Sequence, residues 1–290
     1  MPEPSQTLSI ILPAKNEAPA LPELLARLRE LYPQAELLVV DDGSTDDTAG
    51  AAKTHGARVI RHPYSMGNGA AVKSGARAAT GQVLVFMDAD GQHNANDVPA
   101  MLGKLQSGYA MVVGARNSRS QASLGRGLAN RMYNWLASLM VGHRIPDLTS
   151  GFRAVRAEYF REFLHLLPNG FSYPTTITMA FFRAGYGVAY IPITARNRAG
   201  KSHIHPLRDG VRFLLIIFKV GTLYSPLKIF FPISVVFFLL GLARYLYTFI
   251  ATHQFTVMSA LLFITAILVF LIGLISEQIT NLLFTTRQQR

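Results

Sequence analysis

The sequence predicts a doubly wound α/β domain with a mainly parallel sheet, followed by an interfacial amphipathic helix and a two-helix transmembrane hairpin. Three observations predict this organisation. Apolar strands alternate with helical patterns over residues 8–114, polar clusters directly follow several of these strands, and charged residues are sparse in 226–290. The expected divisions are 1–204, 205–225 and 226–290.

The N-terminal part repeats a strand and a helix several times. Continuous apolar strands separated by helices of about ten residues indicate a parallel sheet covered on both faces, with right-handed crossovers. After Arg116 we expect a helix over 126–141, a loop through 146–150, helices near Glu158 and Thr176, and a strand over 187–193. Before Arg116, the expected strands are 8–12, 36–40, 58–61, 82–87 and 110–114, and the expected helices are 18–31, 45–55, 69–79 and 96–107.

Two long apolar runs, about 229–251 and 257–276, close the chain and contain only Arg244 as a charge. Each matches the roughly 20 residues that span a hydrocarbon core, so a membrane hairpin is favoured over a pair of buried core helices. Arg244 would snorkel to an interface. The connection over 252–256 cannot hold a domain, and basic flanks face the cytoplasm. We therefore expect a protein with two spans and its large domain on the cytoplasmic face of the inner or plasma membrane.

Charge and composition narrow the classes of partner. The 28 Lys and Arg exceed the 17 Asp and Glu, for a net charge of +11, which suits an anionic membrane, a phosphorylated substrate or a nucleic acid. Basic and apolar residues alternate over 205–225, which predicts an amphipathic helix in the membrane interface, or else one packed on the soluble domain. The chain has no Cys, which excludes disulfides and thiolate metal sites.

Polar clusters follow the first, second and fourth expected strands, at 13–17, 41–46 and 88–93. Ligands of open α/β sheets bind at the carboxyl ends of strands, so these clusters are the candidate site. A turn with a helix N-cap would explain Ser44 or Thr45, but it would not explain the adjacent Asp41 and Asp42. Acidic clusters gathered at one edge would repel each other without a cation.

Asp88 and Asp90 are two residues apart on an extended segment, so both carboxylates can point toward one hard cation, with Gln92 two residues further along. This arrangement suits Mg²⁺ or Mn²⁺ bridging a diphosphate. His93 is a weaker candidate for a metal ligand.

These residues form part of a longer series of motifs. The series comprises Leu12-Pro-Ala-Lys-Asn-Glu17, Val39-Val-Asp-Asp-Gly-Ser-Thr-Asp46, Gly67-Asn-Gly-Ala70, Asp88-Ala-Asp90, Gly114-Ala-Arg116, Gly125-Arg126-Gly-Leu-Ala-Asn130, Asp147-Leu-Thr-Ser-Gly-Phe-Arg153 and Gly200-Lys-Ser202. In this order they resemble inverting family-2 glycosyltransferases with the GT-A fold, in the dolichol-phosphate mannose synthase-like, polyprenyl-phosphate glycosyltransferase branch. Members of that branch often carry a C-terminal membrane hairpin.

The resemblance implies a role for each matching position. The nucleoside would be held by Pro13, Lys15, Glu17, Val40 and Asp42. The metal and diphosphate would be held by Asp88, Ala89, Asp90 and Gln92, with Asp88, Asp90 and Gln92 as the metal ligands. The implied catalytic and phosphate-binding set is Asp90, Arg116, Arg126, Arg198, Lys201 and His203. The family pattern Arg-x-x-Gly-x-Ser-Lys has Asn197 at its Arg and His203 at its Lys, so Arg196, Arg198 and Lys201 are the substitutes.

The implied activity is inverting transfer of a single sugar from a GDP- or UDP-sugar to a polyprenyl phosphate, with Mg²⁺ or Mn²⁺. Gln-x-x-Arg-Trp, the signature of processive polysaccharide synthases, is absent from the sequence. Two alternatives are transfer to a hydroxyl of another membrane lipid and a non-catalytic nucleotide-binding membrane module. The acidic clusters oppose a nucleic acid partner, whose backbone is anionic. A homo-oligomer is compatible with the sequence.

Overall fold

The computed structural model describes residues 7–116, 124–170, 172–194, 218, 221–222 and 225–285, with backbone alone at 124–130 and 283–285. It divides into two compact units, Met1–Ile204 and His205–Arg290, each of which is considered by itself. The predicted interfacial helix over 205–225 lies almost entirely outside the described residues, as do Arg198, Lys201 and His203.

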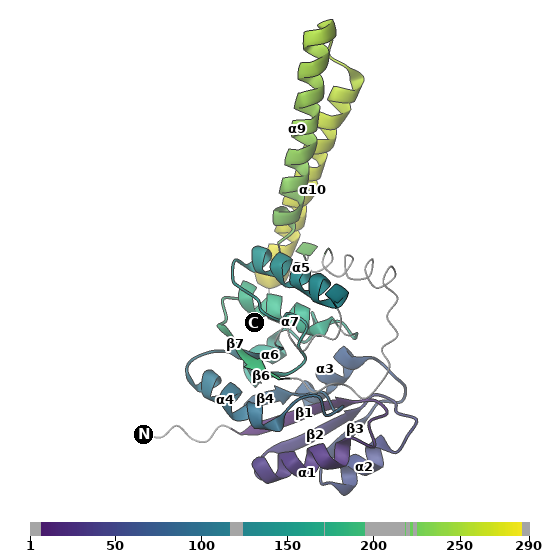
Figure 1. Ribbon diagram of the computed structural model, residues 1–290, viewed down its shortest axis with the longest axis vertical. Coiled ribbons are helices and arrows are strands. Elements are labelled where there is room, and N and C mark those ends of the chain that lie inside the picture. The colour runs from purple at the N-terminus through teal and green to yellow at the C-terminus, as the bar shows by residue number, and fades with distance from the viewer. Residues whose placement is uncertain are drawn as a thin grey trace. The chain divides into compact units, whose positions relative to one another are not determined.

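The first unit is built on a seven-stranded sheet in the order β3-β2-β1-β4-β6-β5-β7 (Figure 1). β6 runs antiparallel to both of its neighbours, and the other pairs are parallel. The strands are β1 (Leu8–Ala14), β2 (Glu36–Asp41), β3 (Arg58–Arg61), β4 (Val83–Phe86), β5 (Met111–Arg116), β6 (Arg153–Arg156) and β7 (Val188–Ile193). The mainly parallel sheet confirms the predicted fold class.

Helices cover both faces of this sheet. Leu21, Leu24, Leu25 and Leu28 form the buried stripe of α1, which packs in one core with residues of β1, β2 and α4. On the opposite face, α3 approaches the sheet so closely that a Cβ on Gly75 would lie 2.4 Å from Ile11 Cγ2. The helices are α1 (Leu21–Leu31), α2 (Thr48–Thr54), α3 (Asn68–Ala78), η1 (Ala95–Asp97), α4 (Val98–Gln106), α5 (Leu124–Val141), α6 (Ala157–Glu162) and α7 (Tyr173–Arg183).

The start of α3 is held against a distant segment of the chain. The Lys73 ammonium donates to Leu167 O at 3.0 Å and to Asn169 Oδ1 at 2.6 Å. A Cβ on Gly69 would lie 2.1 Å from Pro168 O, so only glycine permits this approach. These contacts fix where α3 begins, which matters because its first residue lines the site.

The structure differs from the prediction at two elements. β6 was not predicted, because its four residues carry an arginine at each end and show no apolar run. α2 begins at Thr48 rather than near residue 45. The reason is that the hydroxyl of Ser44 accepts from Asn16 N at 2.9 Å instead of capping the helix.

The second unit is a hairpin of α9 (Pro226–Thr252) and α10 (Val257–Thr285). By length and composition, 226–252 and 257–282 can each cross a membrane, and they contain both predicted runs. The turn places His253 in the left-handed region, with φ 50°. The helices pack closely at glycines: a Cβ on Gly273 would lie 2.6 Å from Phe230 Cβ, and one on Gly241 would lie 3.2 Å from Leu262 Cβ.

Candidate active site

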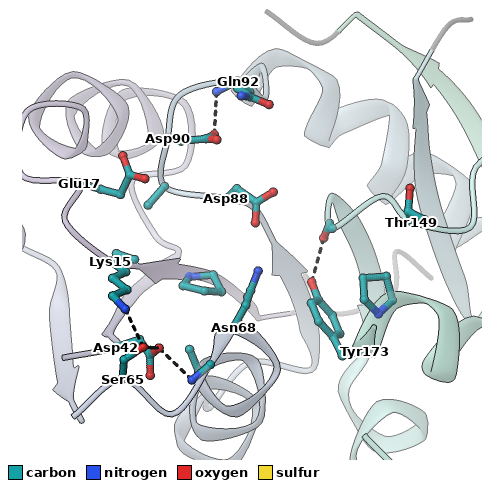
Figure 2. Close-up of a pocket in the computed structure, with 17 residues that line it drawn as sticks. Lys15, Glu17, Asp42, Ser65, Asn68, Asp88, Asp90, Gln92, Thr149 and Tyr173 are labelled. Carbon is teal, nitrogen blue, oxygen red and sulfur yellow. Dashed lines mark hydrogen bonds between the residues drawn. The ribbon is translucent and has the colours of Figure 1, made fainter. Parts of the chain in front are cut away.

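A cavity of about 460 Å³ opens at the carboxyl ends of β1, β2 and β4 (Figure 2). It brings together most of the site residues predicted in the described chain, namely Pro13, Lys15, Glu17, Asp42, Asp88, Ala89, Asp90 and Gln92. The lining also includes Ala14, Ser65, Gly67, Asn68, Ala71, Thr149, Gly151, Tyr173 and Pro174, which were not predicted as site residues. The motifs Gly67–Ala70 and Asp147–Arg153 carried a signal for several of these, whereas nothing pointed to Tyr173 and Pro174.

The loops after β1 and β2 are joined by side-chain hydrogen bonds. Asn16 adopts a left-handed conformation, φ 57°, which asparagine tolerates better than most residues. In this conformation its Oδ1 accepts from Thr45 N at 2.8 Å, while Thr48 Oγ1 accepts from Glu17 N at 3.0 Å. The polar residues of both motifs therefore hold the loops in place, and Lys15 and Glu17 face the cavity between them.

Asp42 organises the segment that leads into α3. One carboxylate oxygen accepts from His62 Nδ1 at 2.7 Å and Met66 N at 2.8 Å, and the other accepts from Ser65 Oγ at 2.8 Å and Gly67 N at 2.9 Å. Burial alone would raise the pKa of Asp42, but these hydrogen bonds outweigh it and hold the pKa below its usual value. Asp42 is therefore an anion that fixes the cavity wall formed by Ser65 and Gly67.

Lys15 extends this wall, because its ammonium donates to Ser65 Oγ at 2.9 Å. Figure 2 shows Lys15, Ser65 and Asp42 on one side of the cavity and Asp88 and Asp90 on the other. The cavity thus has a lysine-bearing side and a side with two carboxylates. This arrangement suits a ligand with a polar body at one end and a metal-bridged anion at the other.

The carboxylate side provides oxygen ligands suited to a hard cation. Asp88 is 39% exposed, and Asp90 Oδ1 accepts from Gln92 N at 3.1 Å, which orients the Asp90 carboxylate. Among the described residues, no three or more His, Cys, Asp or Glu side chains are placed so that they could hold a metal ion together. Mg²⁺ and Mn²⁺ sites of this kind need one or two carboxylates, since a substrate diphosphate supplies further oxygens, so the residues present fit such an ion.

His93 supports this side from beneath. It stacks on Phe152 with ring centroids 4.9 Å apart, and its Nδ1 accepts from Asp88 N at 3.3 Å. Burial lowers the pKa of His93, which keeps the imidazole neutral at neutral pH. His93 therefore holds the backbone of the Asp88 loop.

Two predicted nucleoside and phosphate ligands lie away from the cavity. Val40 is fully buried in β2 and points toward α3, because alternate residues of a strand face opposite sides of the sheet. Its side chain therefore does not line the cavity. Arg116 does not line the cavity either; its guanidinium binds Asp147. Arg126 lies on α5, in the stretch 124–130 for which the structure describes the backbone alone.

The Arg116–Asp147 pair is bidentate. Arg116 Nε donates to Asp147 Oδ2 at 2.8 Å and Nη2 donates to Oδ1 at 3.1 Å, while Nη2 also donates to Thr149 Oγ1 at 2.7 Å. Burial by itself raises the pKa of Asp147, but the hydrogen bonds and charge of Arg116 prevail and lower it. Because Thr149 lines the cavity, Arg116 positions a wall of the site.

This lowered pKa predicts a pH-dependent stability. A carboxylate with a lowered folded pKa stabilises the protein fully above its unfolded pKa, about 4, and loses that effect as the pH falls through the folded value. We expect Asp147→Asn to lower the melting temperature by about 5 °C near pH 7. The gap from wild type should narrow as the pH falls below the unfolded pKa, about 4, and through the lower folded pKa of Asp147. Thermal unfolding of both proteins in detergent checks this, and a gap that widens in acid would contradict it.

A mainly parallel sheet with a cavity at its carboxyl edge, lined by Asp42, Asp88 and Asp90, agrees with the expected GT-A fold. Residues 9–164 match the model for glycosyl transferase family 2, and residues 225–282 match the model for the GtrB C-terminal hairpin. The chain belongs to glycosyl transferase family 2.

Related proteins agree with this assignment. An undecaprenyl-phosphate mannosyltransferase of Micrococcus luteus is 32% identical over 202 residues, covering 65% of this chain and 83% of that protein. A dolichyl-phosphate hexose transferase of Haloferax volcanii is 30% identical over 215 residues, covering 73% of this chain and 93% of that protein.

A solved structure shares the fold of the first unit. Glucosyl-3-phosphoglycerate synthase from Mycobacterium tuberculosis, in complex with Mn²⁺, uridine diphosphate and glucosyl-3-phosphoglycerate, aligns with a TM-score of 0.60 at 24% identity. The alignment covers 75% of this chain and 79% of that one. At this identity the likeness establishes the fold alone.

Proposed function

We propose that this protein transfers a single sugar, with inversion, from a nucleotide sugar to the phosphate of a membrane polyprenol. One observation carries the proposal: the Asp88–Asp90 carboxylate pair and the Asp42 network face one cavity in a chain that also has a GtrB-type hairpin. The names of both relatives above, a mannosyltransferase acting on undecaprenyl phosphate and a hexose transferase acting on dolichyl phosphate, support this acceptor class.

The residues divide the substrate between the two sides of the cavity. The nucleoside of a UDP- or GDP-sugar lies against Pro13, Lys15 and Glu17, beside the wall that Asp42 holds. Asp88, Asp90 and Gln92 hold Mg²⁺ or Mn²⁺, which when bound neutralises the charge that develops on the departing diphosphate. By holding that ion, these three side chains would orient the diphosphate for in-line attack.

The acceptor needs little activation by the protein. A polyprenyl phosphate is already an anion at neutral pH, so its oxygen can attack the sugar carbon without a strong general base. What the protein must supply is positive charge to hold that phosphate. Because Arg116 is bound to Asp147, we assign this role to Arg126, Arg198, Lys201 and His203.

The defining experiment uses the purified full-length protein in detergent, with Mn²⁺, a panel of UDP- and GDP-sugars and a polyprenyl phosphate. Formation of one glycolipid, whose mass equals polyprenyl phosphate plus a single sugar, supports the proposal. Matched arms with diacylglycerol and with no lipid identify the acceptor. Transfer to the hydroxyl lipid alone, or no metal-dependent turnover of any donor, would overturn the proposal.

Arg126 separates acceptor binding from donor binding. A charge that holds the lipid phosphate matters only when that phosphate is present. We expect Arg126→Ala to raise the KM for polyprenyl phosphate, or to lower kcat, by roughly ten- to a hundred-fold. Calorimetric affinity for the nucleoside diphosphate should change by less than about twofold. Arg131→Ala, on the exposed side of the same helix, is the matched control.

We also propose that the hairpin spans the membrane twice and leaves residues 1–225 and the C-terminus in the cytoplasm. The turn over 252–256 would then lie on the opposite side. Reporter fusions after Arg290 and within the turn should label opposite sides of the membrane. A reporter after Arg290 that is found opposite to the N-terminus would contradict the two-span arrangement.

A further inference from the structure

Arg153, the first residue of β6, is a fully buried cation next to the site. Its Nη1 donates to Pro174 O and Thr178 Oγ1, both at 3.3 Å, and its Nη2 donates to Ser150 O. In the part of the chain that the structure describes, Arg153 forms no ion pair, and its Nε is without a hydrogen-bond partner. A buried charge without a direct counter-ion is strongly unfavourable, so its presence calls for a function.

The segments that Arg153 holds are the walls of the cavity. Ser150 lies between Thr149 and Gly151, both of which line the cavity, and Pro174 lines it as well. Carbonyl oxygens from two distant stretches of chain thus converge on one guanidinium. Its fork of donors suits this geometry, and its charge strengthens each hydrogen bond.

One layer of side chain and backbone separates this cation from Asp88. The guanidinium lies over the ring of Tyr173, with Cζ 5.9 Å from the centroid, and the Tyr173 hydroxyl donates to Gly151 O at 3.5 Å. A Cβ on Gly151 would lie 3.2 Å from Asp88 Oδ2, so no further layer fits between Gly151 and this carboxylate. Figure 2 shows Tyr173 and Asp88 facing the same cavity.

Arg153 also interacts electrostatically with the acidic and phenolic groups around it. Burial lowers the pKa of Arg153, whereas its interactions with Tyr173, Tyr190, Asp147 and Asp88 act in the opposite direction. Asp147 is already bound to Arg116. Asp88, unlike Asp147, lines the cavity, so it is the carboxylate of the site that lies in the field of Arg153.

We propose that Arg153 is a positioning residue whose buried charge makes the Asp88–Asp90 site weak for a free divalent cation and strong for a cation that arrives with a diphosphate. A fixed positive charge behind Asp88 opposes the binding of a bare dication and favours the net negative diphosphate. The metal then enters with the nucleotide rather than ahead of it. This inference rests on the proposed function, because it assumes that Asp88 and Asp90 hold the metal.

The test measures two affinities by calorimetry on the full-length protein in detergent: Mn²⁺ alone, and UDP or GDP, whichever binds wild type more tightly, at saturating Mn²⁺. Arg153→Met should bind Mn²⁺ alone about three- to ten-fold more tightly and the nucleoside diphosphate about three- to ten-fold more weakly. Arg153→Lys offers a point charge that burial neutralises more readily than a guanidinium, so both affinities should lie between those of wild type and Arg153→Met. Thr178→Val removes a hydrogen-bond acceptor from Arg153 without removing charge, so it should not tighten the binding of Mn²⁺ alone.

Opposite changes in the two affinities distinguish an electrostatic role from a packing role, because a disordered cavity wall weakens both. If Arg153→Met lowers both affinities, or changes neither, the proposal is wrong. Should Arg153→Met not fold, Arg153→Gln, which keeps an amide donor, carries the same expectation. If Mn²⁺ does not strengthen binding of the nucleoside diphosphate to the wild type, the metal site and this inference are both overturned. If it does, a failure of the Arg153→Met expectations counts against the role of Arg153 alone.

Discussion

Replacing Asp90 by alanine should abolish sugar transfer, with kcat falling by about 10³-fold or more. Asp90 is one of two carboxylates on the cation side of the cavity, and its orientation is fixed by the N–H of Gln92. Without it, the charge that develops on the diphosphate is poorly neutralised in the transition state. Removal of the divalent cation with EDTA should have an effect of similar size on the wild-type enzyme, and Mn²⁺ should restore activity.

The matched control for Asp90→Ala is Glu30→Ala, which removes a carboxylate from the exposed face of α1, where it pairs with Arg27. Its turnover should stay within about twofold of wild type, because exposed ion pairs contribute little. Glycolipid formation at saturating donor and acceptor is the measurement. Near-normal turnover of Asp90→Ala, or of wild type in EDTA, would show that the metal site is wrongly assigned.

Asp42→Ala should lose nucleotide binding even when no lipid is present. Four hydrogen-bond donors converge on this carboxylate, and alanine leaves all of them without their acceptor. We expect the affinity for the nucleoside diphosphate to fall at least about tenfold and the unfolding free energy to fall by about 3 kcal/mol. Calorimetric titration and thermal unfolding measure the two effects.

Two control substitutions, Asp42→Asn and Asp47→Ala, show whether the losses in Asp42→Ala come from the hydrogen-bond network. The Asp42→Asn substitution keeps the size of the side chain and part of its accepting capacity, so it should lose less stability than Asp42→Ala. Asp47 is exposed at the start of α2, and its removal changes the same charge near the site without touching the network. If Asp47→Ala weakens nucleotide binding as much as Asp42→Ala does, the loss of affinity comes from the change in overall charge and the hydrogen-bond network has no special role.

The first half of the fold could be predicted closely from the sequence. Each strand and helix up to β5 has its own local pattern of hydrophobic periodicity and composition in the sequence. The order of these elements could therefore be predicted from the chain alone. β6 could not be found this way, because its strand character comes from pairing with β4 and β5 on both sides. Its buried Arg153 resembles a surface charge in the sequence, since nothing nearby shows that carbonyl groups will surround it.

The same distinction holds for the site. Lys15, Asp42, Asp88 and Asp90 were predicted to lie together because residues that follow parallel strands meet at one edge. Tyr173 reaches the cavity from the start of α7, which no rule about strand ends indicates. The resemblance implied a phosphate-binding role for Arg116. Its partner Asp147 lies 31 residues away, and residue type alone does not identify such a pair.

The antiparallel insertion of β6 also sets an order of events during synthesis of the chain. β3, β2, β1 and β4 pair among themselves, so this half of the sheet can form once residue 86 has left the ribosome. β5 comes next, yet among the described strands it pairs with β6 and β7, both of which follow it. It must wait as an unpaired apolar strand until Arg153–Arg156 emerges, at about 5 to 20 residues per second. During this interval β5 has two unpaired edges, which makes it a template for aggregation until β6 and β7 cover them.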